Sequence, residues 1–579
     1  MMSMSSFRGY GKVEAAAKQA RLEASWKTRK RVTVISISTI ILVCVIVAAV
    51  LGTSQSSGGN SKRVGANSQF HSTVKAVCDI TLYPSTCFDS LAPLAKSKDM
   101  QLEEVFKLAT QVAKTELQRA SQFFSEHSSF KGIIADIMTE VALEDCHQLL
   151  SLALDHLNST LSSSSGTTSF SLLEAADDLK TWLCSAGTYL ETCKDGFENA
   201  NPTLKTNIVN WLKNSTELTS NSLAIISWIS KVQSSLKLRR LMSFSEHHQV
   251  PEWLSPRDRQ LLQSSDHLKK KAQIVVVKDG SGQYRNITAA LKDVPDKSGK
   301  RFVIYVKEGI YYENVRVDKT KWNFVMIGDG MNATIVSGRL NFVDGTPTYS
   351  KATFAVFGKG FIARDMGFQN TAGAIKHQAV ALMSNSDQSV FYRCFIDAFQ
   401  DTLYAHANRQ FYRECNITGT VDFIFGNSAV VLQNCNILPR VPLPGQKNTI
   451  TAQGKFDPNQ NSGISIQNCT ISPYGDLSSV QTYLGRPWKN HSTTLYVGNL
   501  MGSFIDPSGW LPWTGTSAPD TIFYSEFQNY GPGSLTKDRV KWQGVKNITR
   551  KQASKFTVSS FIQGNRWISA AGVPYKSGL

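Results

Sequence analysis

Short phrases that recur in the C-terminal half of this 579-residue chain restrict its fold more than any other feature. The pentapeptide QNCNI at 433–437 returns as QNCTI at 467–471, and FYRC at 391–394 returns as FYREC at 411–415. Recurrence at intervals of a few tens of residues is typical of coils that stack on one another, because each coil repeats the same strand and the same turn. The repeats therefore predict a parallel β-helix.

Short apolar runs separated by Gly and Asn begin at about Ala272, which is the pattern of short strands between tight turns. A β-sandwich is the competing fold for such an all-β core, but a sandwich gives no reason for the recurring phrases. We therefore expect residues 272–579 to form one β-helical domain. The apolar runs are 274–277, 302–306, 324–327 and 429–432.

Asp401 and Asp422 are the most informative chemical residues, because each lies beside an aromatic-rich apolar run. We expect both carboxylates to be carried on packed strands, which hold a catalytic pair more rigidly than loops do. Two carboxyl groups in one desolvated cleft do not both ionise easily, so one stays protonated as an acid while the other is an anion. In the alternative interpretation neither residue is catalytic: Asp401 is a turn residue and Asp422 caps the end of a strand.

Neighbouring polar side chains favour the catalytic interpretation. Gln378 and Gln400 supply neutral amide donors, which suit a developing oxyanion, and Arg486 lies beside an aromatic ring in the motif LGRPW. A planar guanidinium can hold a carboxylate with two hydrogen bonds. The sequence contains no Gly-x-Ser-x-Gly elbow and no Cys/His pair that would serve as nucleophile and base, so elimination also favours the carboxylates.

The motifs around these residues resemble the plant pectin methylesterases, also called pectinesterases, in the form that carries an N-terminal inhibitor-like pro-region. The motifs occur in the order of that family, cover roughly Ala272 to the C-terminus, and are together far more specific than any one alone. The resemblance implies a right-handed parallel β-helix whose active site lies in a long surface cleft. The motifs are GIYYE at 309–313, QAVAL at 378–382, QDTL at 400–403, DFIFG at 422–426 and LGRPW at 484–488.

Carried over residue by residue, the resemblance implies a carboxylic ester hydrolase that removes methyl esters from homogalacturonan and uses no metal or other cofactor. Asp422 would be the nucleophile, and Asp401 would be the proton donor and later the base. Gln378 would form the oxyanion hole and Gln400 would stabilise the transition state. Arg486 would orient the nucleophile.

The resemblance also assigns contacts to the sugar. Thr348 and Trp488 match substrate-binding positions, together with Gln378 and Arg486, although a tryptophan is more often part of a core. His406 has no role in the matched mechanism, so we interpret it as structural. Further aromatic side chains flank the acids and either line the cleft or fill the core; these are Phe399, Tyr404, Phe423 and Phe425.

Residues 70–237 have helical periodicity, with apolar residues recurring at steps of three and four. Polar linkers such as 162–165 separate the periodic stretches, which predicts an all-α four-helix bundle. The cysteine motifs of this region resemble the pectin methylesterase inhibitor family, and disulfides indicate an oxidising compartment. The two resemblances imply the pairs Cys78–Cys87, Cys146–Cys193 and Cys415–Cys435, and they leave Cys184, Cys394 and Cys469 free.

Residues 238–271 form a charged, weakly periodic linker. Its first basic tract, Arg239-Arg240-Leu241-Met242, is similar to the Arg-Arg-Leu-Leu sites at which a subtilisin-like protease separates pro-region from enzyme in this family. Met242 departs from the usual leucine and a second tract at 259–262 contains Gln260, so the choice of site stays open. We expect cleavage after the first tract, and we expect the N-terminal domain to inhibit or chaperone the enzyme until then.

The N-terminal 69 residues predict entry into the secretory pathway. A basic tail at 1–31 precedes an apolar stretch at 32–51, whose length matches a bilayer span, and a Ser/Gly/Asn-rich spacer follows at 52–69. We favour an uncleaved signal anchor over a cleaved signal peptide because the basic lead is long. Glycosylation sequons agree with a lumenal location; examples begin at Asn158, Asn214, Asn332 and Asn547.

The formal net charge of +17 favours acidic partners in general. We find no zinc-ligand spacing and no basic-aromatic RNA motif, so we expect anionic pectin and no nucleic acid to be the partner. Two other functions remain open from the sequence. One is a pectin-cutting hydrolase or lyase, which would need carboxylates placed around a glycosidic bond or Ca²⁺. The other is a binding protein whose helical domain inhibits partner esterases.

Overall fold

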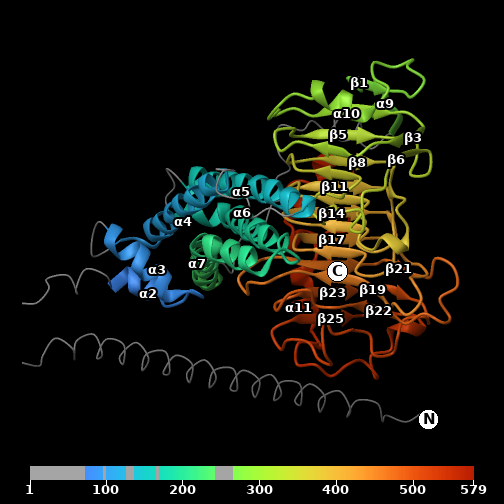
Figure 1. Ribbon diagram of the computed structural model, residues 1–579. Helices are drawn as coiled ribbons and strands as arrows, with labels where there is room; N and C mark the ends of the chain where they lie inside the picture. Colours follow the sequence, from blue (N-terminus) through green and yellow to red (C-terminus); the bar gives the residue numbers. More distant parts are fainter. Residues whose placement is uncertain (1–71, 96–99, 126–135, 165–168, 241–264) are drawn as a thin grey trace, which may run out of the picture. The chain divides into compact units, whose positions relative to one another are not determined.

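The computed structural model describes residues 72–95, 100–125, 136–164, 169–240 and 265–579. The first four of these ranges are helical, and the last consists mainly of short strands, which Figure 1 shows stacked one above another. The boundary between helical and β structure lies where the change of periodicity in the sequence predicts it.

The helical part contains a bundle in which α4 contacts α5 and α7, and α6 contacts α5 and α7. Predicted apolar positions such as Val105, Leu149 and Leu183 are fully or almost fully buried in it. This arrangement confirms the predicted four-helix bundle. The elements are α2 (Ser72–Cys78), α3 (Pro84–Leu91), η1 (Ala92–Leu94), α4 (Leu102–Ser125), α5 (Ile137–Ser164), α6 (Ser169–Asp195) and α7 (Pro202–Arg240).

Two disulfides connect the helical part. Cys78 is bonded to Cys87 at the start of the domain, and Cys146 of α5 is bonded to Cys193 of α6. Both pairings are those that the resemblance implies, and Cys184 is a buried free thiol.

The β part is a parallel β-helix of three sheets, and the strands within each described sheet pair in parallel. The ten-stranded sheet holds β1 (Ile274–Val276), β2 (Phe302–Val306), β5 (Phe324–Ile327), β8 (Ile362–Arg364), β11 (Ser389–Tyr392), β14 (Arg409–Arg413), β17 (Ala429–Gln433), β20 (Gly463–Gln467), β23 (Thr493–Val497) and β25 (Phe523–Phe527). The seven-stranded sheet holds β4 (Val315–Val317), β7 (Phe354–Val356), β10 (Leu382–Ser384), β13 (Leu403–Ala405), β16 (Ile424–Gly426), β19 (Asn448–Gln453) and β22 (Thr482–Gly485). The eight-stranded sheet holds β3 (Gly309–Tyr312), β6 (Thr334–Gly338), β9 (Gly367–Asn370), β12 (Phe395–Asp397), β15 (Asn416–Gly419), β18 (Asn436–Pro439), β21 (Thr470–Ile471) and β24 (Leu500–Met501).

The recurring phrases mark one corner of successive coils. In four successive coils a single residue in the left-handed region turns the chain from the ten-stranded to the eight-stranded sheet; these residues are Arg393, Glu414, Asn434 and Asn468. Asparagine tolerates this conformation better than most residues, which explains its recurrence at this corner. The interior is a continuous apolar stack in which, for example, the rings of Phe391 and Tyr412 lie parallel with centroids 4.7 Å apart.

The cysteine that follows this corner occupies the same position in four successive coils, and here the predicted Cys415–Cys435 disulfide is wrong. All four thiols are free and buried. The thiol of Cys415 donates to the carbonyl of Phe391 at 3.4 Å, and that of Cys435 donates to the carbonyl of Tyr412 at 3.6 Å. Each thiol thus has a hydrogen-bond acceptor in the main chain of the preceding coil. Cys394 and Cys469 are free, as the resemblance implies.

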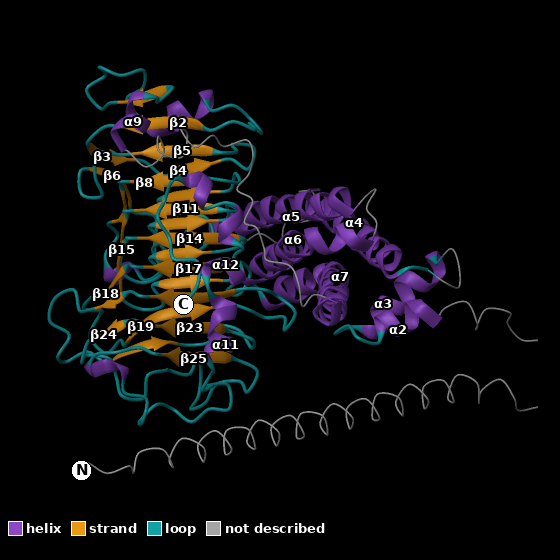
Figure 2. Ribbon diagram, turned by 180° about the vertical axis from the view of Figure 1, so that it is seen from behind, coloured by secondary structure: helices purple, strands orange, loops and turns teal. Residues whose placement is uncertain are grey.

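Short helices cover the outer face of the ten-stranded sheet. Leu268 of α9 (Ser265–Lys270) packs on Val303 and Val325, and Phe561 of α12 (Val558–Phe561) joins the same apolar cluster. Figure 2 shows the ribbons of α9 and α12 beside the strands. Lys269 adds an ion pair with Asp329 at 2.7 Å. The remaining short helices are α10 (Ile287–Ala290), η3 (Leu291–Asp293), η4 (Ala374–Lys376), η5 (Pro532–Ser534), α11 (Arg550–Ala553), η6 (Ser554–Phe556), η7 (Gly564–Arg566) and η8 (Ser569–Ala571).

The ends of the predicted linker belong to folded elements. Helix α7 continues beyond position 237 to Arg240, and α9 packs on the β-helix before Ala272. Leu241 and Met242 lie outside the described residues, as do the predicted anchor at 32–51 and the spacer at 52–69. In the part of the chain that the structure describes, no helix has both the length and the apolar character needed to cross a bilayer.

Because α9 covers the sheet, we expect Leu268→Ala to destabilise a chain of residues 265–579. Loss of a buried leucine side chain costs about 2–5 kcal/mol, so the melting temperature should fall by several degrees. The exposed neighbour Lys270 is the control, since Lys270→Ala removes a side chain that buries little. Thermal melting followed by circular dichroism measures both, and equal melting temperatures for the parent chain and Leu268→Ala would contradict the packing.

Candidate active site

The strand register places Asp401 and Asp422 at equivalent positions in neighbouring coils. Leu403 of β13 pairs with Ile424 of β16, and each aspartate lies two residues before its partner in this pair. Both aspartates stand in turns that precede the strands, rather than on the strands as predicted. The parallel ladder still sets the spacing between them, because it fixes where each strand begins.

Both aspartates have left-handed backbone conformations, with φ of 63° at Asp401 and 53° at Asp422. This region is uncommon for residues other than glycine, and residues held in it cluster at functional sites. The side chains are nearly buried, with 8% of Asp401 and 5% of Asp422 exposed. A shared turn geometry therefore presents two desolvated carboxyl groups on one side of the β-helix.

Arg486 binds both carboxylate oxygens of Asp422 through two nitrogens of its guanidinium. Nε donates to Oδ1 at 2.8 Å and Nη2 donates to Oδ2 at 2.6 Å. The hydroxyl of Thr449 adds a third donor to Oδ1 at 2.6 Å, and the same hydroxyl accepts from the backbone N–H of Asp422 at 2.8 Å. A two-point grip of this kind restricts the rotation of a carboxylate as well as stabilising its charge. Asp422 is thus a fixed anion.

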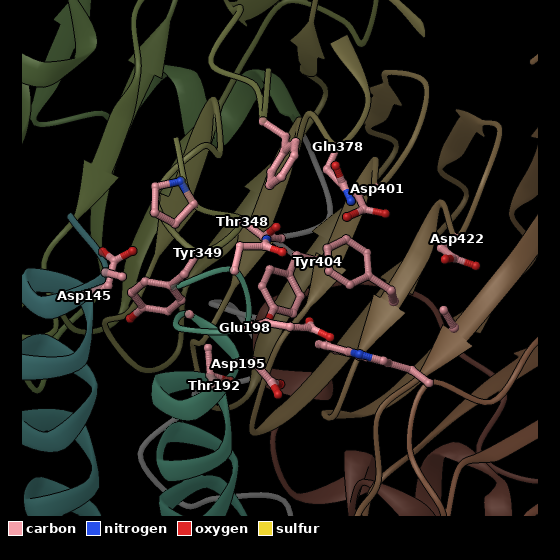
Figure 3. A pocket seen from close by; sticks show the side chains of 18 of the residues that line it. Asp145, Thr192, Asp195, Glu198, Thr348, Tyr349, Gln378, Asp401, Tyr404 and Asp422 are labelled. Atoms are coloured by element: carbon pink, nitrogen blue, oxygen red, sulfur yellow. The ribbon is translucent and has the colours of Figure 1, made fainter. Parts of the chain in front are cut away.

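Gln378 and Gln400 lie side by side on adjacent coils, joined by a parallel bridge between their backbones. The side-chain oxygen of each is buried and has no hydrogen-bond partner among the described residues. A buried polar atom without a partner is unusual in a folded protein and calls for a ligand or water. Figure 3 shows Gln378 directly beside Asp401.

Asp401 is electrostatically distinct from Asp422. Burial, and then the charge of Asp422, raise the pKa of Asp401 to about 8, against the opposing effects of Lys351 and Arg486. The Lys351 side chain is fully buried, and its ammonium has no hydrogen-bond partner in the described structure. Burial lowers the pKa of Lys351, and the charge of Asp401 opposes this. Asp401 therefore carries a proton through the neutral range.

These side chains line one cavity of about 420 Å³. The predicted residues that it contains are Thr348, Gln378, Gln400, Asp401, Asp422, Arg486 and Trp488. Among the flanking aromatic residues, Tyr404 and Phe425 line the cavity with their rings stacked at 4.2 Å, whereas Phe423 is buried in the core of the β-helix. Every residue predicted for the chemistry and for substrate contact therefore reaches the same space.

Comparison with known families identifies the class of this site. A family model described as Pectinesterase matches residues 273–565, and one described as Plant invertase/pectin methylesterase inhibitor matches residues 72–225. This chain belongs to the pectinesterase family. As a pectinesterase it removes methyl esters from pectin, and it carries an inhibitor-like N-terminal domain.

Similar proteins agree over both parts of this pectinesterase. Probable pectinesterase/pectinesterase inhibitor 46 of Arabidopsis thaliana is 55% identical over 98% of this chain and 99% of its own length. Pectinesterase 3 of Phaseolus vulgaris is 47% identical over the whole of both chains. Among solved structures, pectin methylesterase from carrot is 50% identical, with a TM-score of 0.53, and covers 53% of this chain and 98% of its own.

The helical domain of the pectinesterase closes one side of the catalytic cavity. Asp145 of α5 and Thr192 and Asp195 of α6 face the cavity opposite Asp401 and Asp422 (Figure 3). Thr192 also hydrogen-bonds through its hydroxyl to Nε2 of His406 at 2.7 Å. His406 is buried in this contact, which agrees with its interpretation as a structural residue.

Sequence reasoning missed several residues of the site. Trp513 lines the cavity and lies under the guanidinium of Arg486, with 4.4 Å from the guanidinium carbon to the ring centroid. Lys351 has no motif of its own, and its position near Asp401 depends on how the loop before β7 folds back. Asp195 and Thr192 belong to a motif that was identified only for its cysteine. No periodicity or spacing in the sequence connects these residues with the aspartates.

Removal of the Lys351 charge should raise the pKa of Asp401 further, because this ammonium is one of two cations that oppose burial and Asp422. We expect Lys351→Met to move the alkaline limb of the pH–rate profile for methanol release to higher pH, since the protonated acid then persists longer. Lys351→Arg keeps the charge and serves as the matched control. Identical alkaline limbs for Lys351→Met and the parent enzyme would contradict this electrostatic coupling.

Proposed function

We propose that this pectinesterase cleaves its ester through a covalent intermediate on Asp422. In the first step, a carboxylate oxygen of Asp422 attacks the C6 carbonyl of a methyl-esterified galacturonate. The amide groups of Gln378 and Gln400 donate hydrogen bonds to the oxyanion that develops on the carbonyl oxygen. Asp401 gives its proton to the departing methoxy group, so methanol leaves and Asp401 becomes an anion.

In the second step, water hydrolyses the acyl-enzyme. The anionic Asp401 takes a proton from the attacking water, and the hydroxide adds to the acyl carbon that is bound to Asp422. The bond to Asp422 breaks, which releases a galacturonate carboxyl group and restores both aspartates. Arg486 and Thr449 keep Asp422 in one orientation throughout.

The observation that carries this proposal is the difference between the two aspartates. Asp422 is gripped by a guanidinium at 2.6 and 2.8 Å, as a nucleophilic anion requires. Asp401 lies in the same cavity with its pKa raised to about 8 by burial and by Asp422, as a general acid near neutral pH requires. Two environments thus favour two protonation states within one site.

We propose further that the helical domain inhibits the enzyme until the linker is cut. Its helices α5 and α6 line the catalytic cavity, so a polysaccharide cannot enter while they are in place. The contact combines an apolar cluster, in which Phe357 and Tyr404 of the β-helix join the helical core, with two ion pairs. In these pairs Lys319 binds Asp155 at 2.6 Å and Arg409 binds Asp178 at 2.7 Å. Cleavage by a subtilisin-like protease after the tract Arg239-Arg240-Leu241-Met242 would remove the covalent tether and leave only these contacts.

We place the action of the enzyme outside the cell, at the plant cell wall, where pectin is found. Membership of the plant pectinesterases supports this location, and so do the disulfides of the helical domain. The apolar segment at 32–51 would direct the precursor to the secretory pathway and hold it at a membrane before processing.

Replacement of the nucleophile tests the mechanism. A chain of residues 265–579 should release methanol from highly methylated pectin, and Asp422→Ala should abolish that release while its circular dichroism spectrum stays unchanged. Arg486→Lys should lower kcat strongly, because a lysine cannot reproduce a two-point grip. An Asp422→Ala protein that is folded and active would refute the assignment of the nucleophile.

Release of the helical domain should depend on pH. Burial raises the pKa of Asp145 to about 6 from an ordinary value of 3.8, against the opposing effects of Ser350 and Arg316, so protonation of Asp145 favours the docked state. Its contribution to docking is fully present below about pH 4 and is lost as the pH rises through 6. Glu191 has the opposite sign, since Lys489 and Lys194 outweigh its burial and lower its pKa, but its contribution changes only below about pH 4.5.

We therefore expect that, once the chain is cut between 241 and 264, the helical part separates from the β-helix more completely at pH 8 than at pH 5. Size-exclusion chromatography of the cut protein measures the separated fraction. Asp145→Asn, which cannot ionise, should reduce the difference between the two pH values. Equal fractions at both pH values for the unmodified protein would argue against docking controlled by the carboxyl group of Asp145.

A further inference from the structure

Among the described residues, Lys489 of the β-helix binds two carboxylates of the helical domain at once. Its ammonium donates to Asp195 at 2.6 Å and to Glu191 at 3.0 Å, both on helix α6. Burial would lower the pKa of Lys489, but Asp195 and Glu191 outweigh burial and raise it. One lysine of the enzyme thus holds two carboxylates of the inhibitor-like domain.

The position of Lys489 connects this contact with the catalytic cavity. Lys489 directly follows Trp488, a cavity residue, and its ammonium lies 5.5 Å from the centroid of the Trp488 ring. Asp195, which Lys489 binds, lines the same cavity as Asp422 and Arg486. Glu191 and Lys489 line an adjoining small pocket, and Asp195 and Trp488 belong to both spaces, so the contact lies at the edge of the cavity that holds the two aspartates.

The β-helix itself fixes Lys489. The backbone N–H of Lys489 donates to the hydroxyl of Ser492 at 3.2 Å, and that hydroxyl donates to the carbonyl of Lys489 at 2.7 Å. Neither contact involves the helical domain. These bonds hold the backbone of Lys489 next to Trp488, so that once helix α6 leaves, the ammonium stays within reach of the indole ring but has lost its two carboxylate partners.

An aromatic face beside a fixed cation matches a sugar that carries a carboxylate. The apolar face of a pyranose ring packs on an indole, while an ammonium binds an anionic substituent of the same or the next sugar. The proposed reaction converts esterified galacturonates into free galacturonates, so the polymer brings such carboxylates to the cavity next to unreacted esters. The side chains of Glu191 and Asp195 offer the same chemical group at the same cation.

We propose that Lys489 forms a subsite for the free carboxylate of a de-esterified galacturonate, and that Glu191 and Asp195 occupy this subsite in the uncut chain. The proposal rests on the proposed function and adds a preference to it. An ester that neighbours a free uronate is held by Lys489 in addition to the catalytic groups. The enzyme therefore favours partly de-esterified stretches over fully esterified ones.

Binding of unesterified trigalacturonic acid to the chain of residues 265–579 tests the subsite directly, because the assay needs no turnover. The carrot enzyme matches only this part of the chain, over 98% of its own length, so a β-helix of this family folds without a helical domain. Calorimetry at low ionic strength should give a dissociation constant about tenfold higher for Lys489→Gln than for the parent, as expected for loss of one charge-assisted hydrogen bond. Lys489→Arg should keep most of the affinity.

Lys319 supplies a matched control. It also binds a carboxylate of the helical domain, Asp155 at 2.6 Å, but Lys319 and Asp155 both line a separate pocket, whereas Asp195, the partner of Lys489, lines the cavity of the two aspartates. Lys319→Gln removes the same charge from the same face of the enzyme and should change the affinity by less than about twofold, because exposed charges contribute little. An equal loss of affinity in Lys319→Gln and Lys489→Gln, or no loss in Lys489→Gln, overturns the subsite.

Mimicry by helix α6 is tested on the full chain after a cut between 241 and 264. Free trigalacturonic acid should displace the helical part on size-exclusion chromatography, whereas the fully methyl-esterified trimer should displace much less, since it lacks the carboxylates. Equal displacement by the two trimers overturns the mimicry. Methanol release from fully esterified pectin by residues 265–579 is measured in parallel, and its absence marks failure of the proposed function rather than of the subsite.

Discussion

The parallel ladder that joins one coil to the next is the constraint on which the site depends. Because Leu403 pairs with Ile424, the turns before these strands stand directly above one another, and so do Asp401 and Asp422. The following strands continue the relation, since Ile424 pairs with Thr451 and Thr451 pairs with Gly485, next to Arg486. Hydrogen bonds of the backbone thus bring together two carboxyl groups and a guanidinium that are far apart in the chain.

Burial then places Asp401 and Asp422 in different electrostatic surroundings. A carboxylate in a buried place is costly unless it is paired, and Arg486 pairs with Asp422 and leaves Asp401 without such a grip. The pKa of Asp401 rises as a result, first through burial and then through the charge of Asp422. The buried Lys351 opposes this rise without a hydrogen bond of its own, which leaves Asp401 able to both give and take a proton.

Pairing of buried charges also contributes to the contact with the helical domain. Enzyme cations such as Lys319, Arg409 and Lys489 bind carboxylates of helices α5 and α6. An apolar cluster shared by the helical core and the β-helix accompanies these ion pairs. We expect the ion pairs, and not the apolar cluster, to make the contact sensitive to pH and to competing anions.

Much of this protein was predictable from its sequence alone. Recurring phrases predicted the β-helix, periodicity predicted the helical bundle, and ordered motifs predicted the residues that the cavity contains, because local patterns and spacings carry that information. The tertiary structure decided what depends on neighbours distant in the chain. It placed the aspartates in left-handed turns instead of strands, kept Cys415 and Cys435 as thiols bound to the carbonyls of preceding coils, and brought Lys351 and Lys489 to the site. These features arise from stacking and docking, which fix distances and dielectric surroundings that no local pattern records.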